Sequence, residues 1–227
     1  MLGVITLSGK PSLAQIGIGR TGLRVDATGT SMKDLRDQNL VKQRFDYSCG
    51  AAALATLLRY GFGENVTERQ ILVDLFGLLS DEEKAVRLRS GFSLLDLQLV
   101  AEAMDYTAQG FRLTPEQLPL LGGPVIVFIE PRGYKHFAVL RGVRGDRVYL
   151  ADPSRGNIRM PAYNFLKDWL QDDGLGIIFV VEPKTGLPKD KTPLTLTQAG
   201  LPQPEIMTAR EMLAVGNALA GLGELPR

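Results

Sequence analysis

The chain contains a single cysteine, Cys49, and a single histidine, His136, among its 227 residues. A lone cysteine cannot form an internal disulfide, so the core must be stabilised by the burial of apolar side chains. One Cys and one His cannot supply the ligands of an ordinary zinc site, and a haem-attachment or thioredoxin-type motif needs a second cysteine. Three roles remain for Cys49: a buried spectator, a surface thiol or a nucleophile.

The composition is that of an ordinary globular protein. Hydrophobic residues make up 44% of the chain, charged residues 22%, and the formal net charge is +1. This balance gives no electrostatic footprint for nucleic acid or an anionic membrane. No apolar run approaches the ~20 residues of a membrane span. We therefore expect no nucleic-acid partner, no stable membrane span, and no metal or other cofactor.

Changes in composition divide the chain into three parts: an N-terminal segment, 1–31, a central domain, 32–183, and a C-terminal linker and helix, 184–227. The first part contains a short apolar run and a small-x-small tripeptide, Ser12-Leu13-Ala14, that resembles a signal-peptidase site. The run is short and no basic residue precedes it, so this part is either a poor or truncated export signal or a disordered start.

The C-terminal part is first rich in Pro, Lys and Thr and then amphipathic from Thr208 to Leu222. These features predict a linker followed by one helix, which docks on the central domain or on a partner. A chain truncated after Glu182 is accordingly expected to keep a folded core.

Helix-start signals and apolar spacing organise the first half of the central domain. A hydroxyl residue followed three positions later by an acidic or amide residue is the capping-box pattern, which satisfies free amides at the start of a helix. The pattern occurs at Thr67/Gln70, Ser80/Glu83, Ser93/Asp96 and Thr114/Gln117. Together with apolar residues at helical spacing, it predicts two or three short helices.

The second half of the central domain changes to a strand pattern. Runs rich in β-branched residues, bounded by Gly and Pro, predict strands at 124–130, 136–142, 147–150 and 176–182, with a helix at 164–171. Helices followed by strands are typical of the α+β class, in which a helical layer packs on an antiparallel sheet.

Cys49 lies at the predicted start of a helix. Residues 50–60 are rich in Ala and Leu, which favour a helix, and Gly61 is expected to end it. The free amides and dipole at a helix N-terminus favour an anion such as a thiolate. Gly50 is expected to leave room for a substrate backbone beside the sulfur. The alternative is that Cys49 is simply part of the apolar core, because free cysteine is among the most buried residue types.

His136 begins one predicted strand, and Asp152 ends the next. If the two strands form a hairpin, their far ends lie side by side, so Asp152 can face the ring of His136. A thiol nucleophile needs a base, and the base needs a group that orients its ring. Taken singly, His136 fits a half-buried structural histidine, Asp152 a turn initiator, and Gln43 a solvated loop residue. Together with Cys49, these residues are what a papain-like site requires.

The segments QRFDYSCGAAAL and KHFAVLRGVRGDRVYLADPSRG resemble the C39 peptidase family over roughly residues 32–182. Members of that family are papain-like cysteine peptidases, best known for removing double-glycine leader peptides from exported peptides. The resemblance implies that Cys49 is the nucleophile, His136 the general base and Asp152 the residue that orients it. It also implies that Gln43 completes the oxyanion hole with the amide of Cys49.

Two features depart from the transporter-fused members of the family. Ser48 stands where an acidic residue usually precedes the cysteine, and the chain has no membrane spans and no G-x-x-x-x-G-K-[ST] loop of a nucleotide-binding domain. The chain therefore most resembles stand-alone C39-like peptidases of secretion operons, including those of functional bacterial amyloid. This resemblance implies a periplasmic location, with the cytoplasm as the alternative, and partners in a secretion machinery.

We therefore expect a cysteine endopeptidase that cleaves exported proteins after small residues, of the Gly-Gly or Gly-Ala type. A second hypothesis is a C39-like module that binds glycine-rich segments without cutting them. A third is a papain-like amidase or acyltransferase that acts on a non-peptide bond with the same residues. The fourth is a structural accessory protein whose thiol belongs to the core.

Overall fold

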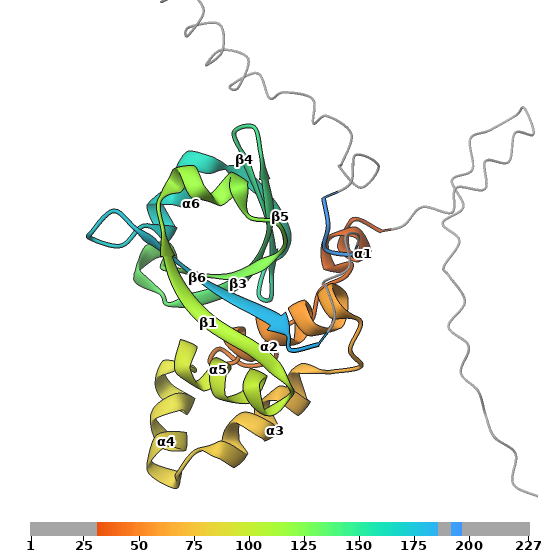
Figure 1. Cartoon of the computed structure of the whole chain (residues 1–227), viewed down its shortest axis with the longest axis vertical. Coiled ribbons are helices and arrows are strands. Elements are labelled where there is room, and N and C mark those ends of the chain that lie inside the picture. Colours follow the sequence, from red (N-terminus) through yellow and green to blue (C-terminus); the bar gives the residue numbers. More distant parts are fainter. Residues whose placement is uncertain (1–30, 186–191, 197–227) are drawn as a thin grey trace, which may run out of the picture.

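A computed structural model describes residues 31–185 and 192–196 of the chain (Figure 1). Apart from Ser31, the N-terminal segment lies outside the described residues, as does the predicted helix from Thr208 to Leu222. Helices come first along the described chain and most strands come after them. The fold is therefore α+β, as the sequence predicts.

The helices are α1 (Met32–Asp37), α2 (Cys49–Thr56), α3 (Glu68–Leu78), α4 (Asp81–Ser90), α5 (Leu94–Ala103) and α6 (Ala162–Trp169). Further helical segments are the π-helical η1 (Leu57–Phe62) and the 3₁₀-helical η2 (Pro115–Leu120) and η3 (Pro131–Gly133). The strands are β1 (Tyr106–Leu113), β2 (Val125–Ile129), β3 (His136–Arg144), β4 (Arg147–Asp152), β5 (Gly156–Pro161) and β6 (Gly176–Pro183). They form one antiparallel, six-stranded sheet in the order β1-β6-β2-β3-β4-β5.

The predicted helix starts are confirmed. Thr67 caps α3, Ser80 caps α4 and Ser93 caps α5. Each hydroxyl accepts a hydrogen bond from the amide three residues later, at 3.2 to 3.3 Å. Each bond satisfies one of the amides that have no acceptor within the helix.

The sheet is covered on both faces. Helices α2, α3 and α5 pack with Ile126 and Phe137 in one apolar cluster, whereas Val127 and Ala138 belong to a second cluster that includes α6. Neighbouring residues of a strand thus enter opposite clusters, as expected from the alternation of side chains along a strand. Figure 1 shows α2, α3 and α5 below the curved sheet and α6 on its other side.

Strands β3 and β4 form the predicted hairpin. Arg144 pairs with Arg147 across a two-residue turn, and Gly145 in this turn has a φ of 56°, a left-handed conformation that favours glycine. The register shifts between Leu140 and Gly142, which marks a β-bulge.

Some elements differ from the predictions. Strands β1 and β5 are not predicted, and both are sheet edges with mostly exposed or half-buried residues. The cysteine helix does not end at Gly61. It continues as the wide turn η1 through Phe62, and Gly63, with a φ of 88°, ends it in the left-handed conformation.

Part of the predicted linker packs on the domain. Leu194 is completely buried and belongs to the cluster formed with α2 and α3. From β3, the guanidinium of Arg141 donates to the carbonyl oxygens of Leu194, at 3.0 Å, and Pro193, at 3.2 Å. The packed core thus includes a residue beyond the central domain predicted from the sequence.

The burial of Leu194 predicts a stability cost for its loss. Leu194→Ala should lower the free energy of unfolding by about 2–5 kcal/mol, because truncation of a buried leucine leaves a cavity. Urea unfolding of the full chain measures this. The matched control is Leu120→Ala, whose leucine is 80% exposed, and it should change stability by less than about 0.5 kcal/mol. A chain ending at Glu182 should be less stable than one ending at Leu196. Equal stabilities would show that Leu194 does not support the core.

Candidate active site

Cys49 is the first residue of α2, as the sequence predicts. All residues of α2 are buried, because Ala and Leu let this helix pack closely between the sheet and the neighbouring helices. As the first helical residue, Cys49 has an amide without an acceptor inside the helix. Cys49 is only 6% exposed, but it lines a surface cleft.

His136 and Asp152 lie side by side at one end of the β3–β4 hairpin. Nε2 of His136 is 3.0 Å from Oδ1 of Asp152, whose side chain is completely buried. The prediction that antiparallel pairing brings the two together is confirmed. The thiol of Cys49 also interacts with the ring of His136, and this interaction helps to raise the pKa of the imidazole. Because Asp152 engages Nε2, Nδ1 is the ring nitrogen that remains for the thiol.

The turn after Asp152 holds its carboxylate. Oδ1 accepts from the amide and hydroxyl of Ser154, both at 2.8 Å, and from the amide of Arg155 at 3.0 Å. The guanidinium of Arg155 donates from Nε to Oδ2 at 2.8 Å. The sequence analysis did not identify Ser154 and Arg155. The tendency of an Asp-Pro-Ser turn to bond its own backbone is the signal that could have indicated them.

These contacts shift the ionisation of both groups. Burial disfavours the imidazolium, but the hydrogen bond to Asp152, the interaction with Cys49 and the charges of these groups outweigh it and raise the pKa of His136 to about 9. Burial opposes ionisation of Asp152 as well, but His136 and Arg155 hold the pKa of this carboxyl well below its ordinary value. The carboxylate therefore stays ionised at neutral pH while the imidazole carries the proton.

Gln43 lies in the loop that leads to Cys49. Its backbone amide donates to the carbonyl oxygen of Pro153 at 3.0 Å, which ties the loop to the residue after Asp152. Its side-chain Nε2 donates to the carbonyl oxygen of Phe45 at 3.0 Å. Its Oε1 is buried and has no hydrogen-bond partner among the described residues. The structure thus brings Gln43 close to the same turn that holds Asp152.

Ser48 precedes Cys49 and is completely buried. Its hydroxyl lies 2.6 Å from Oε1 of Glu68, the first residue of α3. The resemblance leads to an acidic residue at position 48, and the structure instead brings a carboxylate to Ser48 from another helix. Nothing in the local sequence indicates Glu68, because it is nineteen positions away from Cys49 and acidic residues are common in a first helical turn.

The prediction that Gly50 leaves room for a substrate backbone beside the sulfur is wrong. A Cβ at Gly50 would lie 3.2 Å from Phe137 and 3.3 Å from Leu97, and Gly50 does not line the cleft. The missing side chain therefore allows close packing of α2 on β3 and α5, rather than room for a substrate.

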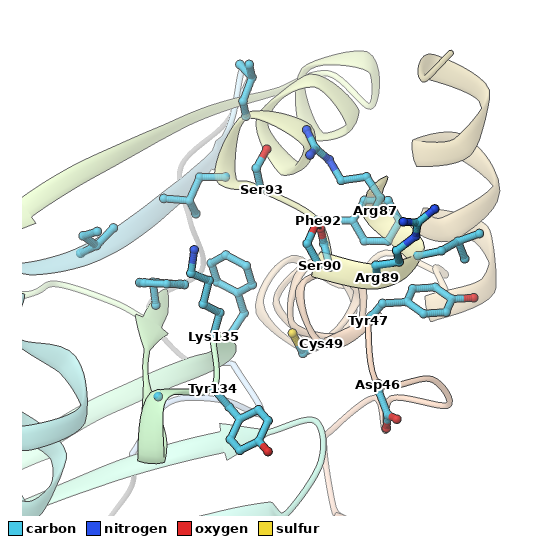
Figure 2. Close-up of a pocket in the computed structure, with 18 residues that line it drawn as sticks. Asp46, Tyr47, Cys49, Arg87, Arg89, Ser90, Phe92, Ser93, Tyr134 and Lys135 are labelled. Carbon is cyan, nitrogen blue, oxygen red and sulfur yellow. The ribbon is translucent and has the colours of Figure 1, made fainter. Parts of the chain in front are cut away.

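A cleft of about 900 Å³ opens over Cys49 (Figure 2). Figure 2 shows Cys49 at its centre, with Tyr134 and Lys135 on one side and Asp46 and Tyr47 on the other. Five aromatic residues line the cleft: Tyr47, Phe92, Phe128, Tyr134 and Phe137. Phe45 does not line it, but stacks on Tyr47 with ring centroids 5.3 Å apart. Cys49 is the one candidate site residue that lines this cleft.

Within the described ranges, no group of three or more His, Cys, Asp or Glu side chains is arranged to hold a metal ion. In the same part of the chain, no helix is long and apolar enough to cross a bilayer. The chemistry that the site offers is that of a thiol beside a base, with the base oriented by a buried carboxylate.

The chain is similar to known peptidases. Two relatives are named "Probable functional amyloid protease FapD". The one from Pseudomonas aeruginosa is 38% identical over 81% of this chain and 74% of its own length. The one from Pseudomonas fluorescens is 37% identical over 73% of this chain and 72% of its own length.

A solved structure, a double glycine motif protease from an AMS/PCAT transporter in complex with its leader peptide, matches with a TM-score of 0.52. It is 29% identical and is aligned over 63% of this chain and 90% of its own. The fold is thus that of papain-like peptidase domains, as the sequence predicts. The model of the Peptidase C39 family matches residues 37–185, and the chain therefore belongs to this family of cysteine peptidases.

Proposed function

We propose that this cysteine peptidase cleaves exported proteins after a pair of small residues, with Cys49 as nucleophile, His136 as general base and Asp152 as the residue that orients His136. The observation that carries the proposal is that His136 is hydrogen-bonded to the buried Asp152 and interacts with Cys49, which lines the cleft. A base held in this way can take the thiol proton without turning away from it.

The reaction follows from the contacts of each group. At neutral pH, Nδ1 of His136 already holds the proton that Cys49 gives up, and the thiolate attacks the carbonyl carbon of the scissile bond. The imidazolium then gives this proton to the leaving amine, which leaves a thioester on Cys49. Water hydrolyses the thioester with His136 again as base. Asp152 remains ionised throughout, because Arg155 and the turn amides stabilise its charge.

Two donors are available for the oxyanion of the tetrahedral intermediate. The amide of Cys49 has no acceptor inside α2. The side-chain amide of Gln43 has two N–H groups, and the carbonyl of Phe45 engages one of them. We assign the other to the oxyanion, and removing one such donor typically costs ~10²–10³ in rate.

The cleft supports a substrate with small residues at the scissile bond. The aromatic residues that line it next to Cys49 are the groups that would exclude larger side chains at the scissile bond. Steric exclusion of this kind discriminates more strongly than the loss of an apolar contact. Leu88 and Leu95 also line the cleft and are 50% and 61% exposed, so apolar residues upstream of the bond can bind there. Such residues supply the affinity that glycine cannot.

The relatives suggest the biological setting. Two of them are named as functional amyloid proteases, so we propose a role in the secretion of a bacterial amyloid, with action in the periplasm. The substrate is then an exported protein, and components of the secretion machinery are the expected partners. Action in the cytoplasm is the alternative that fractionation of cells would reveal.

Substitution of the catalytic residues tests the mechanism. Cys49→Ala and His136→Ala should abolish turnover while circular dichroism shows an intact fold. Asp152→Asn should lower kcat less than either, because an amide can still orient the ring of His136. Normal cleavage by Cys49→Ala would contradict the assignment. Rapid alkylation of Cys49 without cleavage of any peptide would favour the non-cleaving binding module instead.

The pH dependence tests the role of His136. Its raised pKa predicts that kcat/KM falls as pH rises through about 9, because the imidazolium that protonates the leaving amine is lost. Asp152→Asn should move this fall to lower pH, since Asp152 helps to raise the pKa. The same shift stabilises the fold fully below pH 6.5, the ordinary pKa of histidine, and this contribution is lost as pH rises through about 9. If the fall of kcat/KM occurs at the same pH in Asp152→Asn as in wild type, the fall reports the ionisation of a group other than His136.

Mapping of cleavage sites tests the substrate class. Periplasmic and co-secreted proteins are incubated with the wild-type chain or with Cys49→Ala, and new termini are identified by mass spectrometry. We expect cleavage after Gly-Gly or Gly-Ala in extended segments. Cleavage after bulky or charged residues would contradict this specificity and leave the thiol mechanism intact.

A further inference from the structure

The side chain of Glu68 is a buried carboxylate directly beneath the loop that carries the proposed oxyanion donors. Glu68 is only 4% exposed and begins α3. Among the described residues it forms no ion pair with a basic side chain. The N-terminal dipole of α3 favours its negative charge. A buried charge is costly unless it is hydrogen-bonded. The hydrogen bonds of Glu68 therefore indicate the role of its side chain.

Among the described residues, both hydrogen bonds of the Glu68 side chain go to this loop and use the same oxygen. Oε1 accepts from the backbone amide of Arg44 at 2.8 Å and from the hydroxyl of Ser48 at 2.6 Å. Arg44 directly follows Gln43, and Ser48 directly precedes Cys49. Glu68 therefore holds the two ends of the loop that joins the proposed oxyanion donors.

The same loop orients the side chain of Gln43. The carbonyl of Phe45 accepts from Nε2 of Gln43 at 3.0 Å and from the amide of Ser48 at 3.1 Å. The amide of Phe45 in turn donates to the hydroxyl of Ser48 at 3.2 Å. The position of Ser48 thus determines where the Phe45 carbonyl lies, and that carbonyl determines which way the Gln43 amide points.

We propose that Glu68 is a positioning residue for the oxyanion hole, which acts through Ser48 and the Phe45 carbonyl on the side-chain amide of Gln43. This inference rests on the proposed function, because it concerns the transition state of the same reaction. The side chain of Glu68 is hydrogen-bonded to Arg44 and Ser48, not to the thiol or the imidazole. Its loss should therefore weaken stabilisation of the oxyanion and leave the Cys49–His136 pair in place.

Kinetics of Glu68 variants of the full chain test the inference, with a peptide that ends in Gly-Gly-amidomethylcoumarin as substrate, or the peptide that site mapping identifies. Glu68→Ala should lower kcat about tenfold to hundredfold with KM little changed, because the oxyanion forms only in the transition state. Glu68→Gln should stay within about threefold of wild type, since its carbonyl can replace Oε1 for both bonds. Rates are expressed per alkylatable Cys49, the single thiol of the chain, so partial unfolding does not mimic the effect.

A double substitution separates positioning from a general loss of structure. In a Gln43→Ala background, Glu68→Ala should cost less than about threefold, because the group through which it acts is already missing. Alkylation of Cys49 by iodoacetamide has no oxyanion and should proceed at the wild-type rate in Glu68→Ala. If Glu68→Ala does not fold, Ser48→Ala breaks the same link and should show the same kcat loss and the same non-additivity.

The matched control is Tyr106→Phe. It removes a hydroxyl that donates to Glu64 at 2.9 Å, in a buried tyrosine outside the loop, and should leave kcat unchanged. Losses that multiply in the Gln43→Ala, Glu68→Ala pair would overturn the inference, as would an unchanged kcat in Glu68→Ala. If the wild-type chain cleaves no peptide, the proposed function fails and this inference fails with it. If the wild-type chain cleaves the peptide but the rate losses of Gln43→Ala and Glu68→Ala are independent, only this inference fails and the proposed function stands.

Discussion

The antiparallel pairing of β3 with β4 is the constraint on which the site depends. The hairpin returns the chain so that its last residue, Asp152, meets its first, His136, and the two side chains hydrogen-bond at 3.0 Å. The short turn at Gly145 fixes which residues face one another. A shift of register by one residue would bring a residue other than Asp152 beside His136 and would break this hydrogen bond.

The packing of α2 on β3 brings the nucleophile to this pair. A helix composed mainly of Ala lies close to the sheet because its side chains are small, and Gly50 lets it contact Phe137 without a clash. Phe137 follows His136 directly, so the contact that sets the distance between helix and strand lies beside the proposed catalytic residues. The apolar core and the geometry of the site are therefore set by the same contacts, which explains how a single thiol can be both buried and placed for reaction.

Much of the fold and of the site could be predicted from the sequence, because the relevant signals are local. The caps of α3, α4 and α5 and the apolar runs of the inner strands each depend on neighbours in the chain. The mixed sequences of β1 and β5 gave no such signal, since edge strands need few buried residues. The burial of Leu194 and the contact of Glu68 with Ser48 could not be predicted either, because both depend on segments that only the folded chain brings together.

The charge of Asp152 is shared among several hydrogen-bond partners, and this affects the protonation of His136. Asp152 is fully buried yet accepts from His136, Ser154 and Arg155, so its negative charge is stabilised from two sides. If the only partner of the carboxylate were His136, its charge would act on the ring alone and would favour the imidazolium still more strongly. Arg155, which is 44% exposed, offsets part of that effect. The turn after β4 thus holds Asp152 in place and also moderates how tightly His136 keeps its proton, which in the proposed mechanism passes to the leaving amine in every cycle.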